Sequence, residues 1–211
     1  MLGGLLALAP LPAMAALVDV VLAEAAGQTV TASDVALARA LGVFGLSPSA
    51  APIAAEDVER VIAARLEVVE AERLGIGPSE AERERAWAET AARLGGPEAL
   101  AVWLRDAAVE PAWARQVVEQ DLARRHFVDL RFRSFVFVTE AEVTDALGPG
   151  EHPPAERERR REALREAETE RRRAAWLAEA RARVSVRVRL GPGETVPLPL
   201  AMPKSAGESR R

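Results

Sequence analysis

A strict alternation of apolar and polar residues occupies the stretch Val184-Ser-Val-Arg-Val-Arg-Leu190. Alternation of period two is typical of a β-strand, because successive side chains point to opposite faces. Near the start of the chain, Leu17–Ala25 and Thr29–Thr31 flank a glycine turn and predict a β-hairpin. We expect residues 184–190 to return to this hairpin and form a small sheet with it, with Val186 and Val188 on one buried face.

Between these strands the apolar residues recur every three or four positions, which is the periodicity of helices. Ser33 is positioned to cap the first helix. The predicted helical segments are Asp34–Leu41, Glu56–Leu74, Glu80–Leu94, Glu98–Ala108, Pro111–Arg133, Glu140–Leu147 and Ala155–Arg183. We predict a mainly α (α+β) fold, in which a helical body of about six helices carries the small sheet formed by the N-terminal hairpin and the C-terminal strand.

The same periodicity predicts which residues face the core. In two helices the inward sets are Val58, Val61, Ile62, Leu66 and Val69, and Trp113, Val117, Val118, Phe127 and Leu130. Ser134–Val138 is short, apolar and extended, and Thr139 follows it as a helix cap. We expect Trp176 to anchor the long charged helix on the body.

Composition excludes several classes of site. The chain has 211 residues, a formal net charge of −4, two histidines and no cysteine. Disulfides, thiolate zinc sites, iron–sulfur clusters and cysteine nucleophiles are therefore excluded. His126 and His152 lie in no motif that would orient a serine nucleophile, and the glycine pairs match no phosphate-binding loop. We predict no catalytic residues, no metal site and no cofactor.

The long charged helix argues against nucleic-acid binding. Residues 156–173 contain eight arginines and six glutamates, and the interspersed glutamates would repel phosphates. We expect a solvated helix with one narrow apolar stripe.

The first residues are apolar and uncharged. Residues 1–15 have the length and the small residues before a cleavage point that are typical of a signal peptide, although no basic residue precedes the apolar run. That run is too short to span a bilayer. We predict export by a signal peptide over residues 1–15 and no stable membrane insertion.

Large aromatic residues are the remaining candidates for function. Trp87, Trp103 and Trp113 fall on three neighbouring predicted helices, and Phe127 follows on the last of them. These residues either pack in the core or line an apolar groove that receives a peptide, and we retain them as candidate peptide-binding residues.

An ordered series of local strings resembles the N-terminal domain of SurA-type periplasmic chaperones. The strings are Val18–Asp34, Val61–Leu66, Glu70–Gly75, Ser79–Glu82, Arg131–Arg133, Phe137–Val143 and Trp176–Val186. The resemblance covers residues 16–190, where we place one chaperone domain; residues 191–211, rich in Pro, Gly, Ser and Arg, are expected to be a disordered tail.

The chain also departs from that family. The family carries a parvulin isomerase domain of about 90 residues where this chain has only a Gly/Pro linker between Val143 and Ala155, so the isomerase histidines have no place. The family's Val-Asn-Gly turn is Ala25-Ala26-Gly27 here.

The resemblance implies an ATP-independent periplasmic holdase that binds unfolded polypeptides such as outer-membrane protein precursors. Two alternatives stay open: a prolyl isomerase or an accessory domain of one, and a structural or assembly factor of the cell envelope with one fixed partner. The oligomeric state and the client surface are not predicted.

Overall fold

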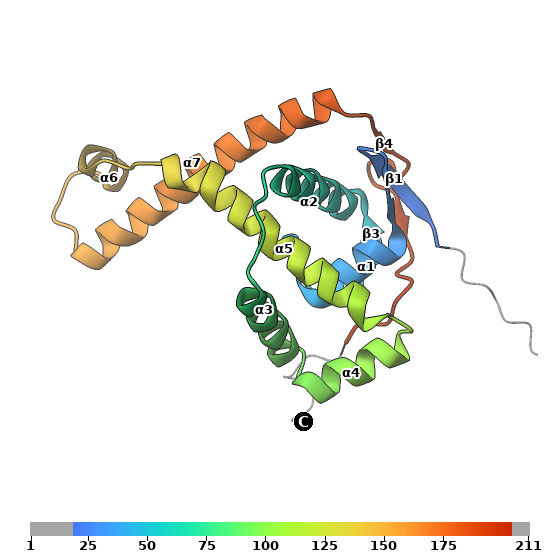
Figure 1. Ribbon diagram of the computed structural model, residues 1–211. Coiled ribbons are helices and arrows are strands. Elements are labelled where there is room, and N and C mark those ends of the chain that lie inside the picture. The colour runs from blue at the N-terminus through green and yellow to red at the C-terminus, as the bar shows by residue number, and fades with distance from the viewer. Residues whose placement is uncertain (1–18, 204–211) are drawn as a thin grey trace, which may run out of the picture.

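A hairpin near the start of the described residues and a strand far along the chain meet in one antiparallel sheet. The computed structural model describes residues 19–203, and the expected signal peptide lies outside them. Strands β1 (Val21–Ala25), β2 (Gln28–Thr31) and β4 (Val186–Val188) form a sheet in the order β2-β1-β4 (Figure 1). Ala23 lies opposite Val188, and the Arg189 N–H donates to the Leu22 carbonyl at 2.8 Å. The predicted return of residues 184–190 to the hairpin is confirmed.

The hairpin turn requires an unusual backbone. Ala26 and Gly27 both have positive φ, 50° and 78°, as the two central residues of a type I′ turn must. Glycine adopts this conformation without strain, whereas alanine does so at a cost.

The predicted fold class is confirmed. Residues 19–203 contain seven α-helices, one for each of the seven predicted helical segments, with small antiparallel sheets. The helices are α1 (Ala32–Leu41), α2 (Ala55–Arg73), α3 (Glu80–Arg93), α4 (Pro97–Asp106), α5 (Pro111–Arg131), α6 (Glu140–Leu147) and α7 (Pro154–Arg183). A second sheet pairs β3 (Ile53–Ala54) with β5 (Thr195–Val196). No helix among the described residues is long and apolar enough to cross a membrane.

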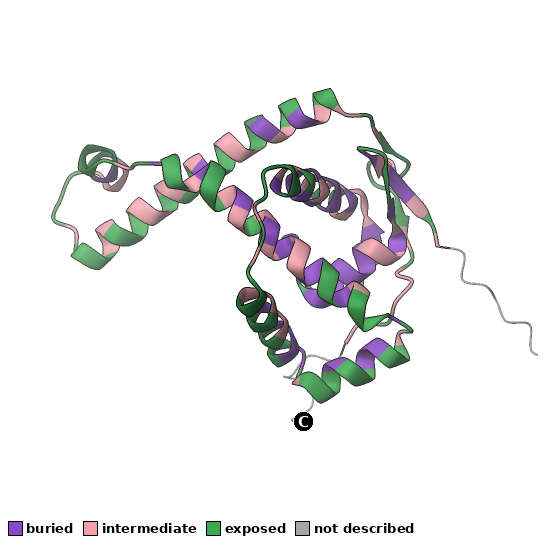
Figure 2. Cartoon of the chain, viewed as in Figure 1, coloured by how far each residue is buried: buried purple, intermediate pink, exposed green. Residues whose placement is uncertain are grey.

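The main core lies where α1, α2 and α5 meet the larger sheet, and the buried residues gather there in Figure 2. Val35, Val58, Val61 and Ile62 are completely buried in it. The expected inward sets were wrong at one position in each of two helices, because Val69 and Leu130 are exposed. Both follow an inward residue of the same helix by three positions, Leu66 and Phe127.

Helix α7 docks on the body through a separate aromatic cluster. Trp176 packs against Phe127 and Phe132 with ring centroids 5.1 and 6.1 Å apart, and the two phenylalanines meet edge to face at 5.7 Å. All three side chains are buried. The expected anchoring role of Trp176 is confirmed, and Phe127 belongs to this anchor.

Two local predictions need correction. Thr31, not Ser33, caps α1, because Asp34 three residues later accepts the Thr31 N–H and completes a reciprocal capping box. The stretch 134–138, predicted to be extended, is extended only from Val136, because residues 133–135 make a single 3₁₀ turn.

The C-terminal segment up to residue 203, part of the stretch 191–211 that we expected to be a disordered tail, lies against the body. Thr195–Val196 pairs with β3, and Leu198, Leu200 and Met202 pack against the main core. The Pro-rich composition gave no indication of this packing, although apolar residues occupy every second position from Val196 to Met202. Residues 204–211 lie outside the described residues.

Candidate peptide-binding surfaces

Helix α6, the segment before it and the first half of α7 project from the body as an arm, defined here as residues 135–171 (Figure 1). The arm is held together by Val143, which is completely buried, and by Arg157 and Arg161, which both bind Glu140. It therefore presents its own surface to solvent beyond the helical body.

A groove of about 600 Å³ runs along the arm between the extended chain that precedes α6, α6 itself and α7. We call it the arm groove. It is lined by Val136, Phe137, Val138, Glu142, Asp145, Ala146, Leu164, Ala167, Glu168 and Arg171. Most of these side chains are apolar, and the charged ones supply a rim of carboxylates with one guanidinium.

Two phenylalanines are exposed beside this groove. Phe137 lines it and is 83% exposed, and Phe135, two residues earlier, is 62% exposed. Single exposed apolar residues are common on protein surfaces, but two neighbouring aromatic side chains beside an apolar groove are typical of a binding surface.

The local sequence holds these phenylalanines outward. Arg172 of α7 donates to the Phe135 carbonyl at 3.0 Å, and Arg133 binds Glu162 and Glu166 of the same helix. The backbone of this segment is thus fixed to α7 while its aromatic side chains stay in solvent.

The start of α6 fixes the other end of the segment. The Glu142 carboxylate accepts hydrogen bonds from the Thr139 N–H and hydroxyl, both at 2.7 Å, and these bonds lower the pKa of Glu142. Across the groove, hydrogen bonds from Arg171 and Arg172 lower the pKa of Glu168 to about 2. Both carboxylates are therefore ionised at neutral pH, and the rim stays charged.

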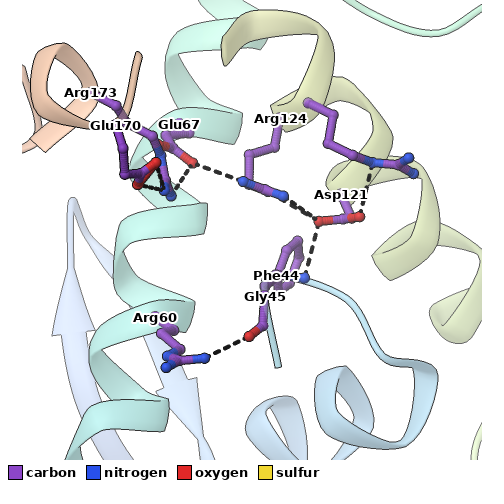
Figure 3. A network of polar contacts seen from close by, with 9 residues as sticks. Phe44, Gly45, Arg60, Glu67, Asp121, Arg124, Glu170 and Arg173 are labelled. Atoms are coloured by element: carbon purple, nitrogen blue, oxygen red, sulfur yellow. Dashed lines mark hydrogen bonds and ion pairs between the residues drawn. The ribbon is translucent and has the colours of Figure 1, made fainter. Parts of the chain in front are cut away.

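A buried ion-pair network sets the position of α7, and with it that of the arm (Figure 3). Glu67 of α2 is completely buried and binds Arg173 of α7 and, at 3.6 Å, Arg124 of α5. Arg124 also donates to Asp121 at 3.0 Å, and Asp121 accepts the Phe44 N–H at 3.0 Å.

This network stabilises the protonated, charged form of Arg173. Burial on its own lowers the pKa of Arg173, but the hydrogen bond and charge of Glu67, assisted by Glu170, outweigh that effect and raise the pKa. The result is a fixed connection between three helices.

A second cavity of about 600 Å³ lies among α3, α4 and α5, and we call it the helix pocket. Its lining is Trp87, Pro97, Leu100, Ala101, Leu104, Arg105, Ala108, Val109, Glu110, Pro111 and Arg115. The Arg115 guanidinium lies 4.7 Å from the centroid of the Trp87 ring and also binds Glu84. One face of Trp87 is therefore covered by a cation.

The four residues that we predicted for peptide binding do not converge on one surface. Trp87 lines the helix pocket, Trp113 is half-buried against the main core, and Phe127 is completely buried in the α7 anchor. Trp103 is only 8% exposed, and its indole N–H donates to the Ala201 carbonyl at 2.8 Å. In this conformation the C-terminal segment thus reaches Trp103.

The sequence reasoning missed Phe135 and Phe137. Residues 134–138 were described only as a short, apolar, extended stretch, and neither phenylalanine was considered for peptide binding. No family model matches this chain, and a search of curated proteins found no significant match.

Proposed function

We propose that this protein is an ATP-independent periplasmic holdase that binds unfolded or extended polypeptides such as outer-membrane protein precursors. The observation that carries the proposal is the pair of exposed phenylalanines beside the arm groove. The resemblance of residues 16–190 to SurA-type chaperones supports the same function and the choice of client.

The physical basis of such binding is apolar contact. Fully burying a Phe side chain contributes about 1.5–3 kcal/mol, so Phe135 and Phe137 together supply at most about 6 kcal/mol. A micromolar complex requires about 8 kcal/mol, and ordering the client costs further free energy. Binding through the arm should therefore be weak and reversible, which suits a protein that delays aggregation without trapping its client.

The charged rim adds selectivity to this contact. Glu142, Asp145 and Glu168 border the groove, against Arg171 alone. An acidic client segment would meet like charge there, whereas neutral or basic apolar segments would not.

The experiment is suppression of aggregation. An unfolded outer-membrane protein is diluted into buffer with the wild-type chain or with the double variant Phe135→Ser/Phe137→Ser, and light scattering is recorded. We expect wild type to delay aggregation and the double variant to lose most of that effect, because both side chains are exposed and their replacement leaves the core intact.

The matched control is Val20→Ser/Val102→Ser, which also removes two exposed apolar side chains but lies outside the arm. It should protect as well as wild type. The holdase proposal fails if wild type protects none of several unrelated clients; protection of a single client would indicate the fixed-partner assembly factor. If the Phe135→Ser/Phe137→Ser variant protects clients as well as wild type does, these phenylalanines of the arm do not bind the client.

A further inference from the structure

The C-terminal segment, residues 195–202, lies on the body in the way that a bound peptide lies on its receptor. It begins as the strand Thr195–Val196 and bends at residues 199–200, and Val196, Leu198, Leu200 and Met202 all pack against the main core. The intervening positions carry Pro197 and Pro199, which lack an N–H and so leave no donor unpaired. We call this segment the tail.

Backbone contacts hold the tail at both ends. Near its start, Thr195 pairs with Ala54 and Val196 with Ile53, so the tail adds a strand to β3. Near its end, Trp103 donates its indole N–H to the Ala201 carbonyl. Backbone pairing plus the burial of alternate side chains is a general mode of peptide recognition, and it depends little on the peptide's exact sequence.

The tail is attached in a way that permits release. Its pairing with β3 involves only two residues on each strand, and its apolar side chains are half-buried, not enclosed. It is joined to β4 through a turn in which the Glu194 carboxylate accepts the Gly191 N–H at 2.7 Å and Gly193 has a φ of 79°. Detachment from this turn onward would leave the pairing of β4 with β1 in place.

We propose that the surface beneath the tail, which includes Ile53, Ala54 and Trp103, is a binding site for an extended polypeptide with apolar side chains at alternate positions. The tail occupies this site until a client segment of the same chemistry displaces it. This inference rests on the proposed function, because an unfolded client supplies such segments, but it concerns a site distinct from the arm groove.

The tether makes the tail a strong competitor. A segment linked by a short connection acts at a local concentration on the order of millimolar, so a free peptide at micromolar concentration displaces little of it. A long client held first by the arm would present its other segments at a comparable local concentration. The arm groove would then bind the client first, and the tail site would bind another segment of the same client afterwards.

The test locks the tail in place. Ala54 and Thr195 are directly opposed in an antiparallel pair, a position where the Cα separation suits a disulfide. The chain has no cysteine of its own, so Ala54→Cys/Thr195→Cys would form a single defined bridge. The probe is a fluorescein-labelled peptide with the sequence of residues 194–203, whose binding to the full chain is followed by fluorescence anisotropy.

We expect the reduced variant to bind the peptide as wild type does and the oxidised variant to bind it at least about 10-fold more weakly. Conversely, Leu198→Ser/Leu200→Ser in the full chain should bind the peptide at least about 10-fold more tightly than wild type, because its own tail competes less well. A peptide in which serine replaces the four alternate apolar residues is the control and should not bind.

Equal peptide binding in the oxidised and reduced states would overturn the tail site, whatever the affinity of the Leu198→Ser/Leu200→Ser variant for the peptide. The proposed function is tested separately by aggregation suppression. If no client is protected but the disulfide still abolishes peptide binding, the tail site is supported and the holdase function is refuted. If the oxidised and the reduced variant protect clients equally and bind the peptide equally, the holdase function is supported and the tail site is refuted.

Discussion

Glu67 is a buried carboxylate on which three helices depend. Its two oxygens face Arg173 of α7 and Arg124 of α5, and no part of the side chain is exposed. Removing one member of a buried ion pair leaves the other charge without compensation, which costs more than the pair itself contributes.

We therefore expect Glu67→Gln to lower the free energy of unfolding by about 3–5 kcal/mol. Glu170→Gln, which removes the exposed partner of the same Arg173, should cost about 1 kcal/mol or less. Urea denaturation followed by circular dichroism measures both. Equal destabilisation by the two variants would mean that the buried carboxylate has no special role in holding α7.

At the scale of single elements, the helices are stabilised by contacts between neighbours on the same helix. The reciprocal bonds of Thr139 and Glu142 begin α6, and this start was predicted correctly from the position of Thr139. On α7, Glu168 accepts hydrogen bonds from Arg171 and Arg172, three and four residues later on the same helix face.

The α7 contacts predict a pH dependence. Because hydrogen bonds from Arg171 and Arg172 lower the pKa of Glu168 from 4.5 to about 2, the folded state favours the ionised carboxylate. The resulting stabilisation is complete above pH 4.5 and is lost as the pH falls toward 2. Carboxyl carbon NMR should show Glu168 titrating near pH 2, and Arg171→Gln/Arg172→Gln should move that midpoint toward 4.5. A wild-type midpoint near 4.5 would contradict the observed bonding.

At the scale of the whole molecule, the fold closes where β4 reaches β1. The expectation that Val186 and Val188 share a buried face was wrong in part: Val186 packs against the main core, whereas Val188 is 39% exposed. Both valines lie on β4, the edge strand of this sheet.

The two valines should therefore respond differently to charge. Val186→Asp places an unpaired carboxylate against the core and should lower the free energy of unfolding by about 2 kcal/mol or more. Val188→Asp leaves its carboxylate in contact with water and should cost less than about 0.5 kcal/mol. Thermal denaturation of the two single variants makes the comparison, and equal melting temperatures would contradict this account of the closure.

Local patterns in the sequence determined most of the secondary structure and the pairing of the N-terminal hairpin with β4. Helix boundaries follow from caps and glycines, and the strands follow from alternation, because these signals depend on neighbours within a few residues. The anchoring role of Trp176 was likewise accessible, since a lone large aromatic residue on a charged helix has few places to be buried.

Only the tertiary structure decided which apolar residues stay exposed. Phe127 and Phe137 are equally apolar, yet one is enclosed by α7 and the other projects from the arm. The tail was hidden for the same reason: its alternate apolar residues acquire a partner only when β3 and Trp103, far away in the sequence, are brought beneath them. Burial depends on contacts between distant segments, and a local pattern does not specify which segments those are.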